Sequence, residues 1–171
     1  MSTQLLIIGA GVYGLVAKEI AESMGCFDTI AFADDAAHQL PDGTTVVGKV
    51  TDIGQLGTQF SHAVVAIGNP QVRRSILQTL EEHTSCTVAR LVSPQAYVAP
   101  SAVLGAGCIV EPMAVVHTGC TLDKGCLISA GAVVNHGAHL CETVHVDCNA
   151  TVLGGKTVPA GTKVESGTVF K

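Results

Sequence analysis

Two groups of residues in this sequence have types and spacings that could do chemistry. The first is the segment GAGVYG from Gly9 to Gly14, which has the G-x-G-x-x-G spacing of loops that bind nucleotide phosphates. Its first two glycines allow a tight turn and the close approach of a phosphate to a helix N-terminus, and the third allows close packing of strand and helix. The second group consists of histidines, whose imidazole can accept a proton near neutral pH. Those in the second half of the chain are His117, His136, His139 and His145.

The elements that must position the glycine loop alternate between strand and helix. Hydrophobic patterning predicts strands at 3–9, 29–33, 63–68 and 86–91 and helices at 15–24 and 71–82. This order predicts a Rossmann-like α/β domain with a parallel sheet. Asp34 and Asp35 follow the second strand, about twenty residues after Gly14, where a carboxylate can receive a ribose hydroxyl.

The size of this first half limits its ligand. About 90 residues are too few for the six-stranded fold that binds dinucleotides, and nothing downstream resembles a hydride-transfer site. A mononucleotide or a nucleotide-sugar therefore fits better than NAD. The alternative is a glycine turn that serves packing alone.

The histidines of the second half lie within a six-residue repeat. Apolar residues occupy every sixth position from Val98 to Phe170, thirteen in succession. Glycines often stand three positions after them and small residues four positions after them, which predicts short strands joined by sharp turns. Three hexads close one triangular coil of about eighteen residues, so the repeat predicts an all-β solenoid. The four histidines occupy three different positions in the hexad, which argues against a metal site that uses all four.

Composition excludes several classes of protein. Hydrophobic residues make up 47% of the 171 residues and charged residues 13%, so the chain can bury a core. The net charge of −5 argues against nucleic acid as a partner. The start of the chain is apolar only from Leu5 to Ile8 and lacks a basic region, so we expect neither a signal peptide nor a membrane span, and a cytoplasmic protein. Seven cysteines without a C-x-x-C pair predict buried thiols rather than disulfides or a standard zinc site.

Taken together, the two halves resemble the PglD and NeuD family of sugar acyltransferases over nearly the whole chain. The segments that carry the resemblance are IIGAGVYG, FADD, AIGNPQVRR, LVSPQAYVAPSAVLGAG and SAGAVVNHGAHLCETVHVDCNATVLGG. The last segment is the most specific, because it keeps the family's interval of nine residues between two histidines, here His136 and His145. The resemblance implies that the hexapeptide repeat forms a left-handed parallel β-helix.

The resemblance also implies an activity and a division of labour. A Rossmann-like domain (residues 1–93) would bind a nucleotide-linked sugar such as a UDP-sugar, or sialic acid, and a β-helix domain (94–171) would bind acetyl-CoA in a groove of a homotrimer. His136 would be the general base, and His145 and Gly154 would contact the acetyl-thioester; no metal is expected. The substrate-binding residues would be Gly9, Gly11, Tyr13, Gly14, Asp34, Asp35, Asn69 and Ser129.

Four departures from the family pattern keep two other functions open. Gly137 stands where the family has a carboxylate after its base, Ser129 where it often has Asn, and Tyr13 where it often has His. The repeat also stops at Lys171, a coil or two early, which would remove surface that grips the far end of CoA. The alternatives are acyl transfer to an amino acid such as serine or to tetrahydrodipicolinate, and a trimeric nucleotide-binding scaffold with weakened catalysis.

Overall fold

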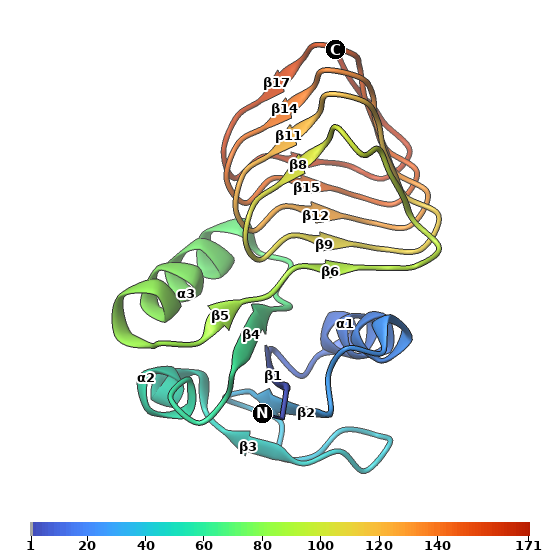
Figure 1. Cartoon of the computed structure of the whole chain (residues 1–171). Helices are drawn as coiled ribbons and strands as arrows, with labels where there is room; N and C mark the ends of the chain where they lie inside the picture. The colour runs from blue at the N-terminus through green and yellow to red at the C-terminus, as the bar shows by residue number, and fades with distance from the viewer. Residues whose placement is uncertain (1) are drawn as a thin grey trace. The chain divides into compact units, whose positions relative to one another are not determined.

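A computed structural model describes residues 2–171 of the chain (Figure 1). Two units follow one another in the chain, with the boundary between Ala89 and Arg90. The first unit contains helices and a single sheet, and the second contains only short strands and turns. Among residues 2–171, no helix is both long and apolar enough to cross a membrane.

The first unit is built on a five-stranded sheet in which every pairing is parallel, with the order β3-β2-β1-β4-β5. The central strand β1 is fully buried from Leu5 to Ile8, which explains its unbroken apolar sequence. Leu6 and Ile8 pack with apolar residues of α2 and α3. The strands are β1 (Gln4–Ile8), β2 (Thr29–Ala33), β3 (Val46–Gly48), β4 (His62–Val65) and β5 (Thr87–Val88), and the helices are α1 (Val12–Met24), the 3-10 helix η1 (Val50–Asp52), α2 (Ile53–Leu56) and α3 (Pro70–His83).

The sequence predicted most of these elements, but not all. The second strand begins and ends where the pattern placed it, whereas the third ends at Val65 rather than 68, because the chain turns there toward the cap of α3. The edge strand β3 and the short helix α2 were not predicted. The expected strand at 86–91 is only Thr87–Val88, since Leu91 begins the first strand of the second unit.

The second unit is a stack of triangular coils, seen in Figure 1 from yellow-green to red. Each coil places one two-residue strand in each of three parallel sheets, and residues eighteen apart are paired, as Val115 is with Val133. This geometry confirms the solenoid that the repeat predicts and fits the left-handed β-helix that the resemblance implies. The three sheets contain β6 (Leu91–Val92), β9 (Ile109–Val110), β12 (Leu127–Ile128), β15 (His145–Val146) and β18 (Lys163–Val164); β7 (Tyr97–Val98), β10 (Val115–Val116), β13 (Val133–Val134), β16 (Thr151–Val152) and β19 (Val169–Phe170); and β8 (Val103–Leu104), β11 (Thr121–Leu122), β14 (His139–Leu140) and β17 (Thr157–Val158).

The six-residue repeat forms the core of this unit. The repeat positions from Val110 to Val164 are all buried, and those in the end coils, Val98, Leu104 and Phe170, are partly buried because they have a neighbouring coil on one side only. Three cysteines, Cys108, Cys120 and Cys126, are fully buried among these residues, as predicted. The hexad glycines turn through positive φ at each corner, and Met113, Thr143 and Asn149 adopt the same conformation at equivalent positions.

Candidate active site

The glycine loop joins β1 to α1, and its three glycines have different roles. Gly9 has a φ of +104°, and a Cβ there would stand 2.8 Å from the Ala66 carbonyl oxygen. A Cβ on Gly14 would overlap the carbonyl oxygen of Gly9. Gly11, the N-cap of α1, has an ordinary φ of −75°, and no described atom lies within 4 Å of its Cβ position. The fold thus requires Gly9 and Gly14, whereas Gly11 leaves open space at the helix N-terminus, where a phosphate can approach.

Asp34 ties the glycine loop to the end of β2. Its Oδ2 accepts a hydrogen bond of 2.8 Å from the Ala10 N–H, and its Oδ1 accepts from the N–H groups of Ala36 and Ala37, each at 2.9 Å. Burial alone would raise the pKa of the Asp34 carboxyl, but these backbone hydrogen bonds outweigh it and lower that pKa. Asp35 accepts from the Val50 N–H at 2.9 Å. Both carboxylates, predicted as ligands of the nucleotide, therefore also hold loops at the sheet edge.

A cavity of about 210 Å³ opens beside these two carboxylates. It lies next to the end of β2 and along β3, at the carboxyl edge where parallel sheets bind ligands. It is lined by Asp34, Asp35, Ala37, His38, Val46, Val47, Gly48 and Lys49.

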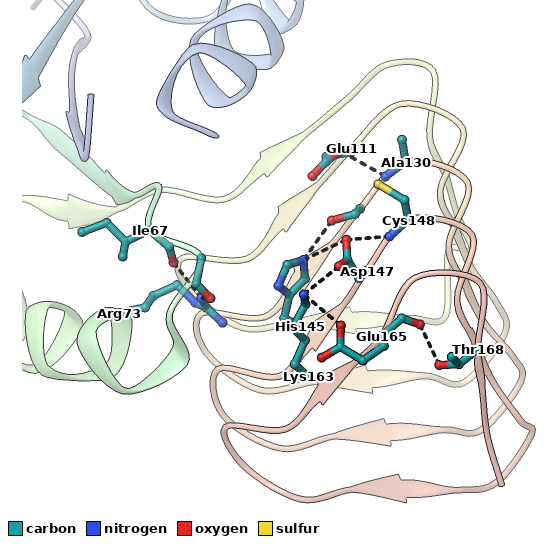
Figure 2. A network of polar contacts seen from close by, with 12 residues as sticks. Ile67, Arg73, Glu111, Ala130, His145, Asp147, Cys148, Lys163, Glu165 and Thr168 are labelled. Atoms are coloured by element: carbon teal, nitrogen blue, oxygen red, sulfur yellow. Dashed lines mark hydrogen bonds and ion pairs between the residues drawn. The ribbon is translucent and has the colours of Figure 1, made fainter. Parts of the chain in front are cut away.

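Two polar side chains fix the junction between the loop after β4 and α3, one at the N-cap and one in the first turn of the helix. Asn69 caps the helix, because its Oδ1 accepts from the N–H groups of Gln71 and Val72 at 3.0 and 3.1 Å. Arg73 is fully buried, and its Nη1 donates to the carbonyl oxygens of Ile67, at 2.7 Å, and Gly68, at 3.0 Å (Figure 2). This burial was not predicted, since arginines near a helix start usually face solvent. Tyr13, in the first turn of α1, is partly buried.

His136 lies exposed on the turn between β13 and β14, and two neighbours confine its ring. The ring of His117 meets it edge to face, with centroids 6.3 Å apart and planes at 74°. Gly154, one coil further along, lies directly against it: a Cβ there would stand 2.7 Å from Cε1, 2.9 Å from Nε2 and 3.2 Å from Nδ1 of His136. The imidazole can occupy this position only because residue 154 has no side chain.

His145 is buried at the start of β15 within a polar network (Figure 2). Its Nε2 lies 3.0 Å from the Ser129 Oγ and 3.8 Å from Oδ1 of Asp147. Lys163 pairs with Asp147 at 2.9 Å and with Glu165 at 3.0 Å. Burial alone would raise the pKa of Asp147, but hydrogen bonds from Lys163 and the Cys148 N–H lower it to about 2. The Ser129 hydroxyl and the Asp147 carboxylate, on the same face of the β-helix, thus fix the position of the His145 ring.

The structure groups the predicted residues of the β-helix into two pairs. His136 lies against Gly154, and His145 lies against Ser129. His136 lies on the β13–β14 turn and His145 lies on strand β15. They occupy different sides of the coil because nine residues are half of an eighteen-residue coil. The contacts of His117 with His136 and of Asp147 with His145 were not predicted. Residues eighteen apart lie side by side on successive coils, so Asp147 lies beside Ser129, and this register could have indicated the contact between Asp147 and His145.

Comparison with known families gives a match for the first unit. Residues 4–80 match the family described as the PglD N-terminal domain. No curated protein matches the sequence significantly.

Solved structures resemble the whole chain. The acetyltransferase domain of PglB from Neisseria gonorrhoeae is 28% identical, with a TM-score of 0.79 over 99% of this chain and 92% of that one. The same domain in complex with acetyl coenzyme A is 26% identical, with a TM-score of 0.71 over 99% and 96% of the two chains. A histidine-to-asparagine mutant of perosamine N-acetyltransferase from Caulobacter crescentus, in complex with CoA and GDP-perosamine, is 26% identical, with a TM-score of 0.82 over 98% and 88%.

Proposed function

Because the chain belongs to the PglD/NeuD-like family of sugar acetyltransferases, we propose that it transfers the acetyl group of acetyl-CoA to an amino group or hydroxyl of a nucleotide-linked sugar or of sialic acid. The observation that carries this proposal is the exposed imidazole of His136, held between His117 and Gly154. Two structural neighbours, with CoA and with acetyl-CoA bound, support acetyl-CoA as the donor.

His136 acts as the general base in this proposal. Its neutral imidazole accepts a proton from the acceptor amine or hydroxyl as that group attacks the thioester carbonyl. The C–N or C–O bond forms, the C–S bond breaks, and the CoA thiolate leaves and takes up a proton. Direct attack needs no acyl-enzyme, so the chain does not require a nucleophilic cysteine.

Packing, rather than a neighbouring carboxylate, orients the base. Gly137 follows His136, so the chain has no acidic side chain at the adjacent position. The ring of His117 bounds the imidazole on one side, and Gly154 lies against it on another. These contacts restrict the imidazole to one region of the turn. Proton transfer requires the base to be held in a fixed position relative to the acceptor group.

The first unit binds the nucleotide part of the sugar substrate in this proposal. The diphosphate lies against the N-terminus of α1, where Gly11 leaves room for it. The cavity beside Asp34 and Asp35 takes the nucleoside. Asp34 accepts hydrogen bonds from the N–H groups of Ala10 and Ala36, which hold the glycine loop and the loop after β2 in position before the ligand arrives.

The placement of the two histidines supports a homotrimer. His136 and His145 leave one coil half a turn apart, so a single chain does not bring both to one thioester. In a trimer, His145 of one chain can face His136 of the next, with its ring set by Ser129 and Asp147. Sedimentation velocity at assay concentration should give the mass of three chains, and a monomeric active enzyme would exclude this arrangement.

A substrate screen tests the proposed function. The purified protein is incubated with acetyl-CoA and, separately, UDP-amino sugars, GDP-amino sugars, sialic acid or serine, and free CoA thiol is measured. We expect thiol release only with a sugar acceptor, together with a product one acetyl group heavier by mass spectrometry. Release with serine would indicate the amino-acid acyltransferase instead. Binding of a nucleotide-sugar without thiol release from any acceptor would indicate the scaffold.

A further inference from the structure

We propose that Asp123, His139 and Cys141 form a binding site for a divalent transition metal, with Zn²⁺ as the fitting ion. The three side chains lie on the coils that contain β11 and β14. Each offers one ligand atom, and the three atoms lie within 4.8 Å of one another. This site uses none of the side chains assigned above to acetyl transfer.

The spacing of the ligand atoms is close to what a tetrahedral ion needs. Zn²⁺ bonds nitrogen and oxygen at about 2.0–2.2 Å and sulfur at about 2.3 Å, so ligand atoms around it stand about 3.3–3.6 Å apart. Nε2 of His139 already lies 3.1 Å from Oδ2 of Asp123. Since the three ligand atoms are at most 4.8 Å apart, the thiol of Cys141 has to move by about 1.2–1.5 Å at most, which a side-chain rotation provides.

The β-helix brings the ligands together by its register. Asp123 and Cys141 are eighteen residues apart, so they stack on successive coils. His139 stands two positions before Cys141, and alternate residues of a strand point to the same face. The register of the coil, and not a local loop, brings these three ligands together, so the site needs no C-x-x-C pair.

The backbone behind the ligands is fixed before any ion binds. The N–H groups of Asp123, His139 and Cys141 donate to the next coil at 2.8, 2.8 and 3.0 Å. Two buried thiols secure the carbonyl oxygens of the same coils: Cys108 donates to that of Asp123 at 3.2 Å, and Cys126 to that of Cys141 at 3.3 Å. The ligand set is thus mounted on rigid elements.

The donor set selects the class of ion. A thiolate, an imidazole and a carboxylate together favour Zn²⁺ and similar transition metals over Mg²⁺ and Ca²⁺, which prefer oxygen alone. Binding displaces the thiol proton of Cys141 to solvent, and three protein ligands leave the fourth position for water. The side chains of His139 and Asp123 are 42% and 37% exposed, so an ion can reach them.

Cobalt titration of the reduced, metal-free, full-length protein tests the site. We expect one equivalent of Co²⁺ to bind with a thiolate-to-cobalt charge-transfer band, Zn²⁺ to displace it, and Zn²⁺ to raise Tm. Cys141→Ser should abolish the band, and His139→Gln should weaken binding by about 100-fold or more. Cys148→Ser is the matched control, since Cys148 is an exposed thiol outside the cluster, and it should leave the titration unchanged.

Circular dichroism and Tm of the metal-free variants separate lost binding from lost folding, and both should equal those of the metal-free wild type. Should Cys141→Ser itself unfold, His139→Gln and Asp123→Asn provide the test. Absence of a charge-transfer band in the wild type overturns the proposal. So does a band that survives Cys141→Ser, or one that disappears in Cys148→Ser.

Discussion

Gly154→Ala tests whether the imidazole of His136 must lie where the structure has it. A Cβ at this position would stand 2.7 Å from Cε1 of His136. Nonbonded carbon atoms prefer about 3.5–4.0 Å, so the ring has to move by about 1 Å. A displacement of this size costs on the order of 100-fold in rate, so we expect kcat to fall about 100-fold. The fold should persist, because Gly154 is not among the residues with positive φ and the atoms it would meet belong to the end of a side chain.

The assay is the initial rate of CoA thiol release at saturating acetyl-CoA and acceptor, with Tm measured in parallel. Gly155→Asn is the matched control: its φ is 69°, Asn149 adopts a similar conformation at the equivalent turn, and no described atom lies within 4 Å of its Cβ position. It should retain the wild-type rate. Combined with His136→Ala, Gly154→Ala should cause no further loss, since both act on one ring. Wild-type kcat in Gly154→Ala would refute the reasoning, and a rise confined to the KM for acetyl-CoA would make Gly154 a cofactor contact instead.

Three further substitutions test the surroundings of the two sites. His117→Ala removes the ring that bounds His136, so kcat should fall about tenfold with both KM values unchanged; unchanged kcat would exclude a positioning role. Asp34→Asn turns an amide N–H toward backbone donors, so unfolding free energy should drop by about 1–3 kcal/mol and calorimetry should show weaker nucleotide-sugar binding. Asp147→Asn should destabilise the chain at pH 7 and flatten its acid unfolding. The pKa of Asp147 is lowered from 3.8 to about 2, so the stability that its carboxylate contributes is complete above pH 3.8 and is lost as pH falls through 2. Thermal melts from pH 5 to 2 in which Tm falls equally with pH in the variant and in the wild type would contradict this.

The repeat was the part of the fold that the sequence predicted best. A buried position at every sixth residue is a constraint that the chain repeats many times, so single exceptions do not hide it. β3 was missed because an edge strand of three residues carries almost no periodic signal. The hand of the coil came from the family resemblance alone.

The sequence predicted which residues belong to the candidate site, but not which atoms their side chains contact. Spacing identified His136 and His145 as a related pair, but side-chain packing across coils decides what each ring contacts. Gly154 was predicted as a cofactor contact, and its closeness to the ring of His136 depends on a register of eighteen residues. Asp34 was predicted as a ribose ligand, and its hydrogen bonds to the glycine loop depend on how two loops meet at the sheet edge. These roles as ligands stay predictions.

The most direct test of the account is the rate of His136→Ala with the acceptor found in the screen. We expect kcat for CoA release to fall by about 100-fold to 10,000-fold, as loss of a general base does, while calorimetric Kd values for CoA and the nucleotide-sugar stay within a few-fold of wild type. A variant that keeps a rate within tenfold of wild type would contradict the assignment of His136 as the base.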